Sequence, residues 1–204
     1  MKNYASMAKE YLEVEIKALE QLDCEAIGRA IDLLEAAFER ERTIYVFGNG
    51  GSSATASHFQ NDFNKGISEH TARKFRFACL NDNVPTVMAI ANDIGFDEVF
   101  RFQLQGKVQA DDVIIAISGS GNSRNVLNAV EYAKTQGGQV IGLTGFDGGK
   151  LRALSDISLH VPVKSMQVTE DVHMIFDHLM MSVFYKVMCG IDHMKGETED
   201  VSLH

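Results

Sequence analysis

Residues 43–63 read Thr-Ile-Tyr-Val-Phe-Gly-Asn-Gly-Gly-Ser-Ser-Ala-Thr-Ala-Ser-His-Phe-Gln-Asn-Asp-Phe, and this stretch decides the fold. A run of β-branched and aromatic residues, a glycine-rich turn and a Ser-led segment without Gly or Pro predict a strand, a loop and a helix. Gly48, Gly50 and Gly51 let the backbone approach a ligand closely, and Ser52 is placed to cap the helix. The unpaired N–H groups of such a helix start favour an anion, most simply a phosphate.

The same helix presents His58 and Asp62, which lie four residues apart and therefore on one face. Because an α-helix rises about 1.5 Å per residue, His58 lies roughly 9 Å beyond Ser52. We therefore expect an anion anchor and a pair able to handle protons or bind a metal to border one cleft. A solvated helix face is the alternative interpretation of the pair. The glycine turn is neither a P-loop, since no Gly-Lys-Ser/Thr closes it, nor the dinucleotide-binding fingerprint.

The composition of the 204-residue chain is that of one ordinary globular domain, with 45% hydrophobic and 23% charged residues. The formal net charge of −9 argues against nucleic acid or an acidic membrane as the main partner, so an anionic substrate has to be held by local backbone dipoles. Three widely spaced cysteines suggest neither a disulfide framework nor a zinc cluster. No apolar run is long enough to span a membrane, and we expect a cytoplasmic protein.

The N-terminal residues 3–22 predict a helix with two apolar stripes. One stripe includes Tyr4 and Tyr11, and the other includes Leu12 and Ile16. Two apolar faces need two partners, so we expect this helix to pack on its own domain and on another subunit. A terminal helix buried within a single chain is the alternative.

A second strand–loop–helix unit repeats the theme of the first. The run Asp-Val-Ile-Ile-Ala-Ile at 112–117 is typical of a strand buried in a parallel sheet, and Ser-Gly-Ser-Gly-Asn-Ser follows at 118–123. Three hydroxyls and a new helix N-terminus form a better phosphate site than the first loop, because hydroxyl and backbone N–H groups can both donate to the anion. A Ser-rich helix cap is the alternative, although a cap needs one Ser rather than three.

The remaining elements complete an α/β pattern. Further strands are expected at 75–80, 139–144 and 157–163, and further helices at 25–40, 85–91, before about 108, at 124–135 and at 169–189. The last helix is expected to bury a stripe that ends at Val187. Alternating strands and helices predict a three-layer αβα sandwich with a parallel sheet, whose ligands lie at the carboxyl ends of the strands. Residues 1–190 are expected to form one domain, and 191–204 an acidic, flexible tail.

Three stretches together resemble the sugar-isomerase (SIS) domain family. They are the Gly-Asn-Gly-Gly-Ser loop with His58, the serine loop at 118–123, and the Glu-Asp-x-His run that begins at Glu170, with His178. Within that family the chain is similar to the phosphoheptose isomerases from its N-terminal helices to about residue 190. The resemblance implies a five-stranded parallel sheet and a homotetramer with active sites at subunit interfaces, where the N-terminal helices and the long C-terminal helix would lie.

The resemblance also implies an activity and its residues. The activity is an aldose–ketose isomerisation of sedoheptulose 7-phosphate to D-glycero-D-manno-heptose 7-phosphate, through an enediol, in bacterial nucleotide-heptose biosynthesis. Substrate contacts fall on Asn49, Gly50, Gly51, Ser52, Asn92, Asp93, Ser118, Gly119, Ser120 and Ser123, with the phosphate on the three serines of the second loop. Acid–base and metal positions fall on His58, Asp62, Glu170 and His178, with Asp62 or Glu170 as the base, His178 as its partner and one Zn²⁺ per subunit.

Two of these positions depart from the family pattern, since Asp62 stands where Glu is usual and Glu170 where Gln is usual. Moving a general base by about 1 Å can cost around a hundredfold in rate. Glu170 and His178 lie about 12 Å apart along an ideal helix, so they share an ion only if the first turn is irregular or another subunit supplies one of them. Two other functions stay open: a non-catalytic SIS protein that binds the bacterial replication initiator, and an isomerase for another phosphosugar.

Overall fold

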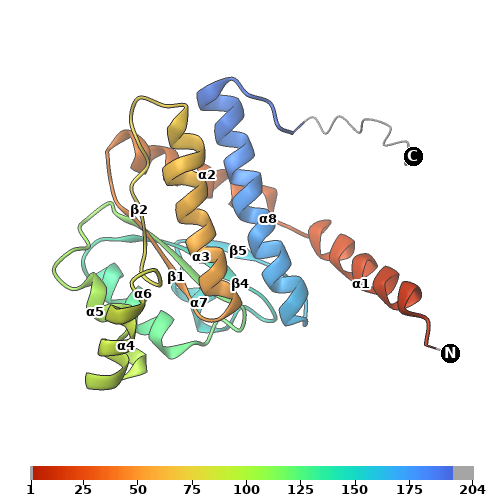
Figure 1. The fold of residues 1–204 in the computed structure, drawn as a ribbon, viewed down its shortest axis with the longest axis horizontal. Coiled ribbons are helices and arrows are strands. Elements are labelled where there is room, and N and C mark those ends of the chain that lie inside the picture. Colours follow the sequence, from red (N-terminus) through yellow and green to blue (C-terminus); the bar gives the residue numbers. More distant parts are fainter. Residues whose placement is uncertain (1, 195–204) are drawn as a thin grey trace.

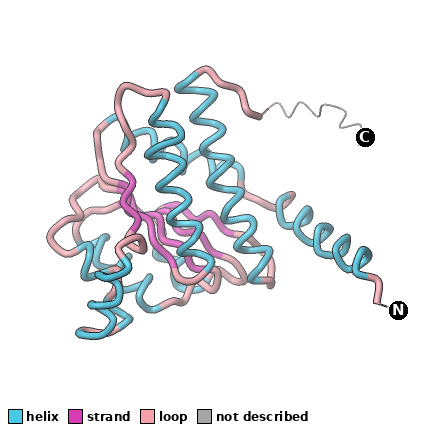
Figure 2. The backbone as a smooth tube through the Cα atoms, viewed as in Figure 1, coloured by secondary structure: helices cyan, strands magenta, loops and turns pink. Residues whose placement is uncertain are grey.

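The computed structural model describes residues 2–194 and places a sheet of five parallel strands between two layers of helices (Figure 1, Figure 2). The strand order is β2-β1-β3-β4-β5. The strands are β1 (Ile44–Gly48), β2 (Phe77–Cys79), β3 (Val113–Ser118), β4 (Gln139–Thr144) and β5 (Ile157–His160). This confirms the predicted three-layer α/β fold.

The helices connect the strands and also extend beyond them at both ends of the chain. The α-helices are α1 (Tyr4–Leu19), α2 (Cys24–Glu39), α3 (Gly51–Asn61), α4 (Val84–Asp93), α5 (Arg101–Leu104), α6 (Arg124–Thr135), α7 (Gly149–Leu154) and α8 (Met166–Phe184). The π-helical turns η1 (Asp62–Ile67) and η3 (Tyr185–Cys189) extend α3 and α8, and the 3₁₀ turn η2 (Phe96–Glu98) precedes α5.

Alternate strand residues point to opposite faces of the sheet and build two cores. Val46 and Ile115 belong to the core that includes buried residues of α2, α3 and α8, whereas Phe47 and Ile114 belong to the core with buried residues of α4 to α7. In the ladder between β1 and β3, Gly48 is paired with Ile117. The first glycine loop and the serine loop therefore leave the same edge of the sheet side by side.

Several local predictions were wrong. The helix expected before residue 108 ends at Leu104, because Gly106 takes a left-handed conformation with φ of +71°. Helix α7 was not predicted. Val187 is 67% exposed because the π-helical turn η3 shifts the phase of the helix before this residue. Ser52 does not cap α3, since Gly50 occupies the N-cap position and Ser52 is buried in the first turn.

Helix α1 extends away from the rest of the chain (Figure 1) and contacts α8. The Tyr11 hydroxyl donates a short hydrogen bond to the Asp171 carboxylate. Tyr4, Leu12 and Ile16 are nevertheless 71%, 55% and 55% exposed. Both predicted apolar stripes are thus largely uncovered in a single chain. Most of the expected tail lies outside the described residues, as it begins at 191 and the description ends at 194.

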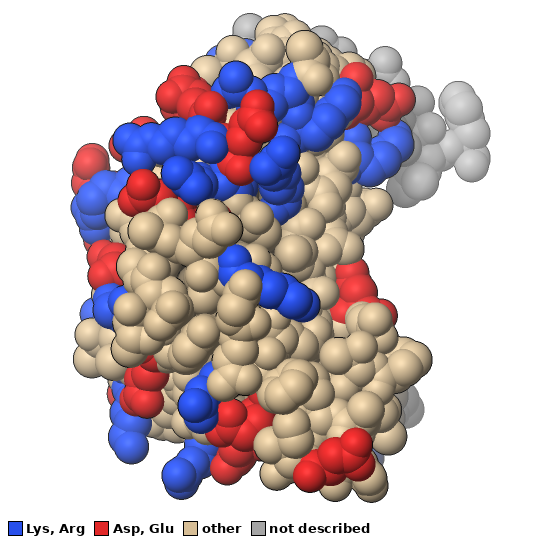
Figure 3. Space-filling view, turned by 90° about the vertical axis from the view of Figure 1, so that its left-hand side faces the viewer, with Lys and Arg blue, Asp and Glu red and all other residues tan. Residues whose placement is uncertain are grey.

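Charged side chains on the face shown in Figure 3 gather toward its ends and leave a largely uncharged middle. In the segment before β2, Arg73 and Arg76 lie 3.6 and 3.4 Å from carboxylate oxygens of Glu41. Because these arginines are paired with a carboxylate, they attract an anionic polymer less than unpaired arginines would.

Within residues 2–194, no helix combines the length and the apolar character needed to cross a membrane.

The buried surface of α8 contains an unusual histidine. His173 has no exposed surface, and within the described residues its ring nitrogens make no hydrogen bond of normal geometry, with the backbone of Thr144 nearby. Burial lowers the pKa of the His173 imidazole to about 4, although the backbone of Thr144 offsets part of this effect. The imidazole is therefore neutral in the folded protein at neutral pH.

We predict that His173 makes the fold sensitive to acid. Between pH 6.5 and 4 the unfolded chain takes up a proton at this position and the folded chain does not, so stability falls as the pH falls. The substitution His173→Met should reduce the loss of unfolding free energy between pH 7 and pH 5 by about 2 kcal/mol. Urea titrations at both pH values measure this loss. The exposed His70→Asn variant is the control, and equal losses in all three proteins would contradict the prediction.

Candidate active site

The two loops at the carboxyl ends of β1 and β3 enclose a cavity of about 260 Å³. The lining residues come from the glycine loop, the serine loop and the start of α8. They are Asn49, Gly50, Gly51, Ser52, Ile117, Ser118, Gly119, Ser120, Ser123, Met166 and Glu170. The structure thus brings together eight of the ten residues that were expected to bind the substrate.

The serine loop presents hydroxyls beside two open helix N-termini. Ser118 Oγ donates to Ser123 Oγ at 3.0 Å, and Ser120 Oγ accepts from the backbone N–H of Asn122 at 3.3 Å. Neither Ser123, the N-cap of α6, nor Gly50, the N-cap of α3, makes a side-chain capping hydrogen bond. Unpaired N–H groups and the helix dipoles favour a negative charge at such positions. The cavity is therefore suited to an anion although the chain is acidic.

Glu170 closes the cavity from the side of α8. An added Cβ on Gly51 would lie 2.2 Å from Glu170 Oε2, so the carboxylate occupies space that only a glycine leaves free. The carboxylate lies at the N-terminus of α3, where the helix dipole stabilises negative charge. A carboxylate that borders a cavity is placed to accept a proton from a molecule bound there.

A second polar group lies further along α3 and α8. His58 Nε2 lies 3.0 Å from His178 Nε2, 3.3 Å from Asp62 Oδ2 and 3.9 Å from Asp177 Oδ2. Two unprotonated imidazole nitrogens repel at this distance unless a proton or a cation lies between them. The ligand atoms of all four residues lie within 4.8 Å of one another. We refer to these four residues as the His–Asp cluster.

The electrostatics of the His–Asp cluster favour a cation. Burial, and then the negative charge of Asp62, raise the pKa of Asp177 to about 8. Two buried carboxylates side by side are stabilised when a positive charge binds between them. Imidazole nitrogens and carboxylate oxygens are ligands that Zn²⁺ accepts in proteins. The residues present thus fit a divalent metal ion.

Comparison with known proteins places this fold and cavity in a family. The family model for the SIS domain matches residues 4–145. The chain belongs to the SIS domain family. A phosphoheptose isomerase of Helicobacter pylori is 38% identical over 172 residues, which cover 84% of this chain and 87% of that protein. A probable phosphoheptose isomerase of Thermoplasma acidophilum is 33% identical over 86% of this chain and 96% of that protein.

Solved structures of SIS proteins agree with this assignment. The phosphoheptose isomerase GmhA from Neisseria gonorrhoeae matches with a TM-score of 0.81 and 33% identity, over 90% of this chain and 97% of that one. A phosphoheptose isomerase from Francisella tularensis matches with a TM-score of 0.83 and 27% identity, over 90% and 98%. The expected resemblance to the SIS family is confirmed.

The structure separates residues that the SIS resemblance had grouped. Within this chain Glu170 lines the cavity of the serine loop and is not in the His–Asp cluster, because α8 is regular and keeps it about 12 Å along the axis from His178. Asn92 and Asp93 do not line the cavity. They lie at the end of α4, where Asn92 Nδ2 donates to Asp93 Oδ1 at 2.8 Å.

Sequence reasoning missed Asp177. The residue lies between Phe176 and His178 and is fully buried on α8. A charged residue that falls on the apolar face of a predicted helix is the signal that could have identified it. Its neighbour His178 was singled out because the SIS resemblance covers it.

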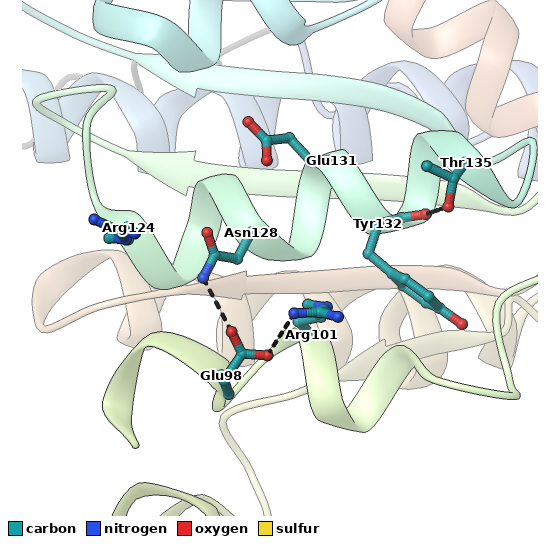
Figure 4. A pocket seen from close by; sticks show the side chains of 7 residues that line it. All are labelled: Glu98, Arg101, Arg124, Asn128, Glu131, Tyr132 and Thr135. Carbon is teal, nitrogen blue, oxygen red and sulfur yellow. Dashed lines mark hydrogen bonds and ion pairs between the residues drawn. The ribbon is translucent and has the colours of Figure 1, made fainter. Parts of the chain in front are cut away.

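A larger cavity, of about 470 Å³, lies between α5 and α6 and is separate from both groups (Figure 4). Its residues Glu98 and Arg101 form an ion pair. Glu98 accepts hydrogen bonds from Arg101 at 3.1 Å and from Asn128 at 3.2 Å. Because these partners already satisfy the carboxylate, this cavity offers weaker chemistry than the cavity of the serine loop.

The close approach of Glu170 to Gly51 leads to a stability prediction. The substitution Gly51→Ala should displace the Glu170 carboxylate and destabilise the protein by about 1 kcal/mol, a cost limited because the atoms that the new methyl group meets are the flexible end of that side chain. In a Glu170→Ala background the same substitution should be neutral or stabilise by up to about 1 kcal/mol, because Ala favours helix over Gly. Urea unfolding of the four proteins measures the coupling.

The matched control is Gly28→Ala, where an added Cβ meets no atom within 4 Å. This substitution within α2 should stabilise by roughly 0.5–1 kcal/mol in either background. Identical effects of Gly51→Ala with and without Glu170 would show that the carboxylate does not occupy this position.

Proposed function

We propose that this SIS protein is an aldose–ketose isomerase that converts sedoheptulose 7-phosphate to D-glycero-D-manno-heptose 7-phosphate. The observation that carries the proposal is the single cavity shared by the serine loop, the N-termini of α3 and α6, and the Glu170 carboxylate. The phosphoheptose isomerases among its relatives support the choice of a heptose. A role in nucleotide-heptose biosynthesis follows from that substrate.

The phosphate group is bound by Ser118, Ser120 and Ser123 and by the N-terminus of α6. This anchor directs the carbonyl end of the sugar away from the serine loop, to a position between Glu170 and the His–Asp cluster. Fixing a substrate in the reactive orientation lowers the activation barrier of the chemical step, because the entropy cost of aligning the reacting groups is already met when the substrate binds.

Proton transfer is assigned to Glu170. Its carboxylate takes the proton from the hydroxyl-bearing carbon next to the carbonyl and returns it to the former carbonyl carbon, while the proton of the adjacent hydroxyl passes to the former carbonyl oxygen, so the enediol forms and collapses with no net change in protons. Asp62, the other candidate base, already lies 3.3 Å from His58 within the cluster. Glu170 instead faces the cavity that holds the phosphate anchor.

The cofactor we propose is Zn²⁺, one per chain, with ligands that include His58, Asp62 and His178. When bound, such an ion supplies positive charge that stabilises a negatively charged oxygen at the carbonyl end of the sugar. His178 Nε2 has one lone pair and faces His58 Nε2 at 3.0 Å, so we assign this atom to the metal rather than to proton transfer.

The location we propose is the cytoplasm. The three cysteines, Cys24, Cys79 and Cys189, are all free, which supports a reducing compartment.

The substitution Glu170→Gln tests the assignment of the base. It preserves the shape of the side chain and removes its basicity, so turnover should fall by about 10²- to 10⁴-fold. NMR of purified protein with sedoheptulose 7-phosphate measures formation of the heptose 7-phosphate. The control Glu131→Gln alters a carboxylate in the separate cavity of α6 and should retain full turnover.

Two outcomes would contradict this part of the proposal. No conversion by the wild-type protein, with and without added zinc, would exclude the isomerase. Full turnover by Glu170→Gln would exclude Glu170 as the base, and loss of turnover in Asp62→Asn with zinc binding retained would move the base to Asp62. Parallel assays with five- and six-carbon sugar phosphates decide whether the heptose is preferred, since a phosphate anchor alone does not distinguish chain lengths.

The exposed stripes of α1 support a homotetramer whose active sites lie at subunit interfaces. Leu12 and Ile16 each expose 55% of their surface, and burying such side chains against another chain stabilises an oligomer. The neighbouring chain is then also the source of further substrate contacts, such as those expected of Asn92 and Asp93.

Sedimentation measures the predicted assembly. At micromolar concentration the protein should sediment with four times the chain mass of 22.5 kDa, and Ile16→Glu should dissociate it, because a charge cannot be buried unpaired in an apolar contact. Lys9→Glu, on the same helix but paired only loosely with Glu13 at 4.0 Å, should leave the mass unchanged. A monomeric wild-type protein would contradict the proposal.

A further inference from the structure

Asp177 is a buried carboxylate whose hydrogen-bonding capacity is unused. Its side chain has no exposed surface, and neither oxygen has a hydrogen-bond partner within the described residues. A buried ionised carboxylate without a partner is costly, so such groups are normally paired or bound to a metal ion. The position therefore requires an interaction that the neighbouring side chains do not provide.

The Asp177 carboxylate is directed at the two imidazoles of the His–Asp cluster. Its Oδ2 atom lies 3.9 Å from Nε2 of His58, and that nitrogen lies 3.0 Å from Nε2 of His178. Zinc bonds of about 2.0–2.2 Å in a tetrahedral arrangement separate neighbouring ligand atoms by roughly 3.3 Å. The distances between atoms of the cluster bracket this value. Small side-chain rotations are enough for one ion to contact all four residues.

We propose that Asp177 is the fourth protein ligand of a divalent metal ion bound by His58, Asp62 and His178, in the place expected for Glu170. The inference rests on the proposed function, which supplies the metal. Two carboxylates balance the charge of a divalent ion, so the buried site carries no net charge. Glu170 is left free of the metal and available for proton transfer.

The four side chains differ in exposure, so the site has a buried side and a side that faces solvent. The carboxylates of Asp62 and Asp177 are 10% and 0% exposed, whereas the imidazoles of His58 and His178 are 39% and 54% exposed. Asp177 thus holds the ion from the protein interior, and the imidazoles lie toward solvent. A zinc ion with four protein ligands can accept a fifth ligand, and only the solvent side is open to it.

Zinc affinity tests the proposal independently of turnover. Full-length protein freed of metal with a chelator is titrated with Zn²⁺ in competition with a chromophoric chelator. The wild-type protein should bind one zinc per chain. Asp177→Asn should bind it more than about 100-fold more weakly, since even ligand-supporting residues outside the coordination shell contribute 10- to 100-fold. Glu170→Gln, the matched control on the same helix, should bind zinc as the wild type does.

Thermal unfolding shows whether the variants remain folded. Without metal, Asp177→Asn should melt near the wild-type temperature, because a neutral amide of the same shape replaces the carboxyl group, and Asp177→Leu should melt at or above it, because it removes an unpartnered buried polar group. With excess zinc, the wild type and Glu170→Gln should melt at higher temperature, whereas the same zinc concentration should raise the melting temperature of the two Asp177 variants much less. This pattern separates loss of a ligand from loss of the fold.

The outcomes distinguish this inference from the proposed isomerase. Normal zinc affinity in both Asp177 variants overturns the role of Asp177. Loss of zinc binding in Glu170→Gln overturns it as well. Neither result decides whether the protein isomerises the sugar, because turnover is measured separately. Absence of zinc binding in the wild type also overturns the role of Asp177. Zinc binding that depends on Asp177 in a protein without isomerase activity supports the metal site and rejects the proposed function.

Discussion

The packing of α3 against α8 determines where the chemistry of this protein can occur. At the start of the contact, the absence of a side chain on Gly51 admits the Glu170 carboxylate. About two turns further along, the same contact brings His58 of α3 to 3.0 Å from His178 of α8. A change in the separation or rotation of these helices would alter both the cavity and the His–Asp cluster. The geometry of the cavity and that of the His–Asp cluster therefore both depend on the packing of α3 against α8.

Anion binding by an acidic chain depends on backbone dipoles. The formal charge is −9, yet the cavity of the serine loop lies at the N-termini of α3 and α6, and both lack a side-chain cap. The field of a helix end acts within about one turn, whereas exposed charges more than about 10 Å away are screened by salt. Local geometry therefore outweighs net charge. The register of β1 and β3 creates this geometry by aligning Gly48 with Ile117.

The sequence was informative where structure depends on local patterns. Apolar runs and glycine or serine turns identified all five strands and both loops, because these features depend on neighbouring residues. The wrongly predicted burial of Val187 and the overlooked Asp177 have another origin. A π-helical turn shifts the helix phase, and the burial of a charge depends on the helix packed opposite. Membership of the His–Asp cluster depends on distances between separate elements, which spacing along one helix does not give.

The two departures from the family pattern are physically compatible with one another. A carboxylate in place of the usual amide at Glu170 adds a negative charge, and the N-terminus of α3 stabilises it. The shorter Asp62 draws its oxygen closer to the helix axis, yet it still lies 3.3 Å from His58. Asp177 approaches the same imidazole nitrogen to 3.9 Å from α8. Short carboxylates on both helices can therefore surround an ion close to the α3–α8 contact, while the longer Glu170 side chain lines the cavity of the serine loop.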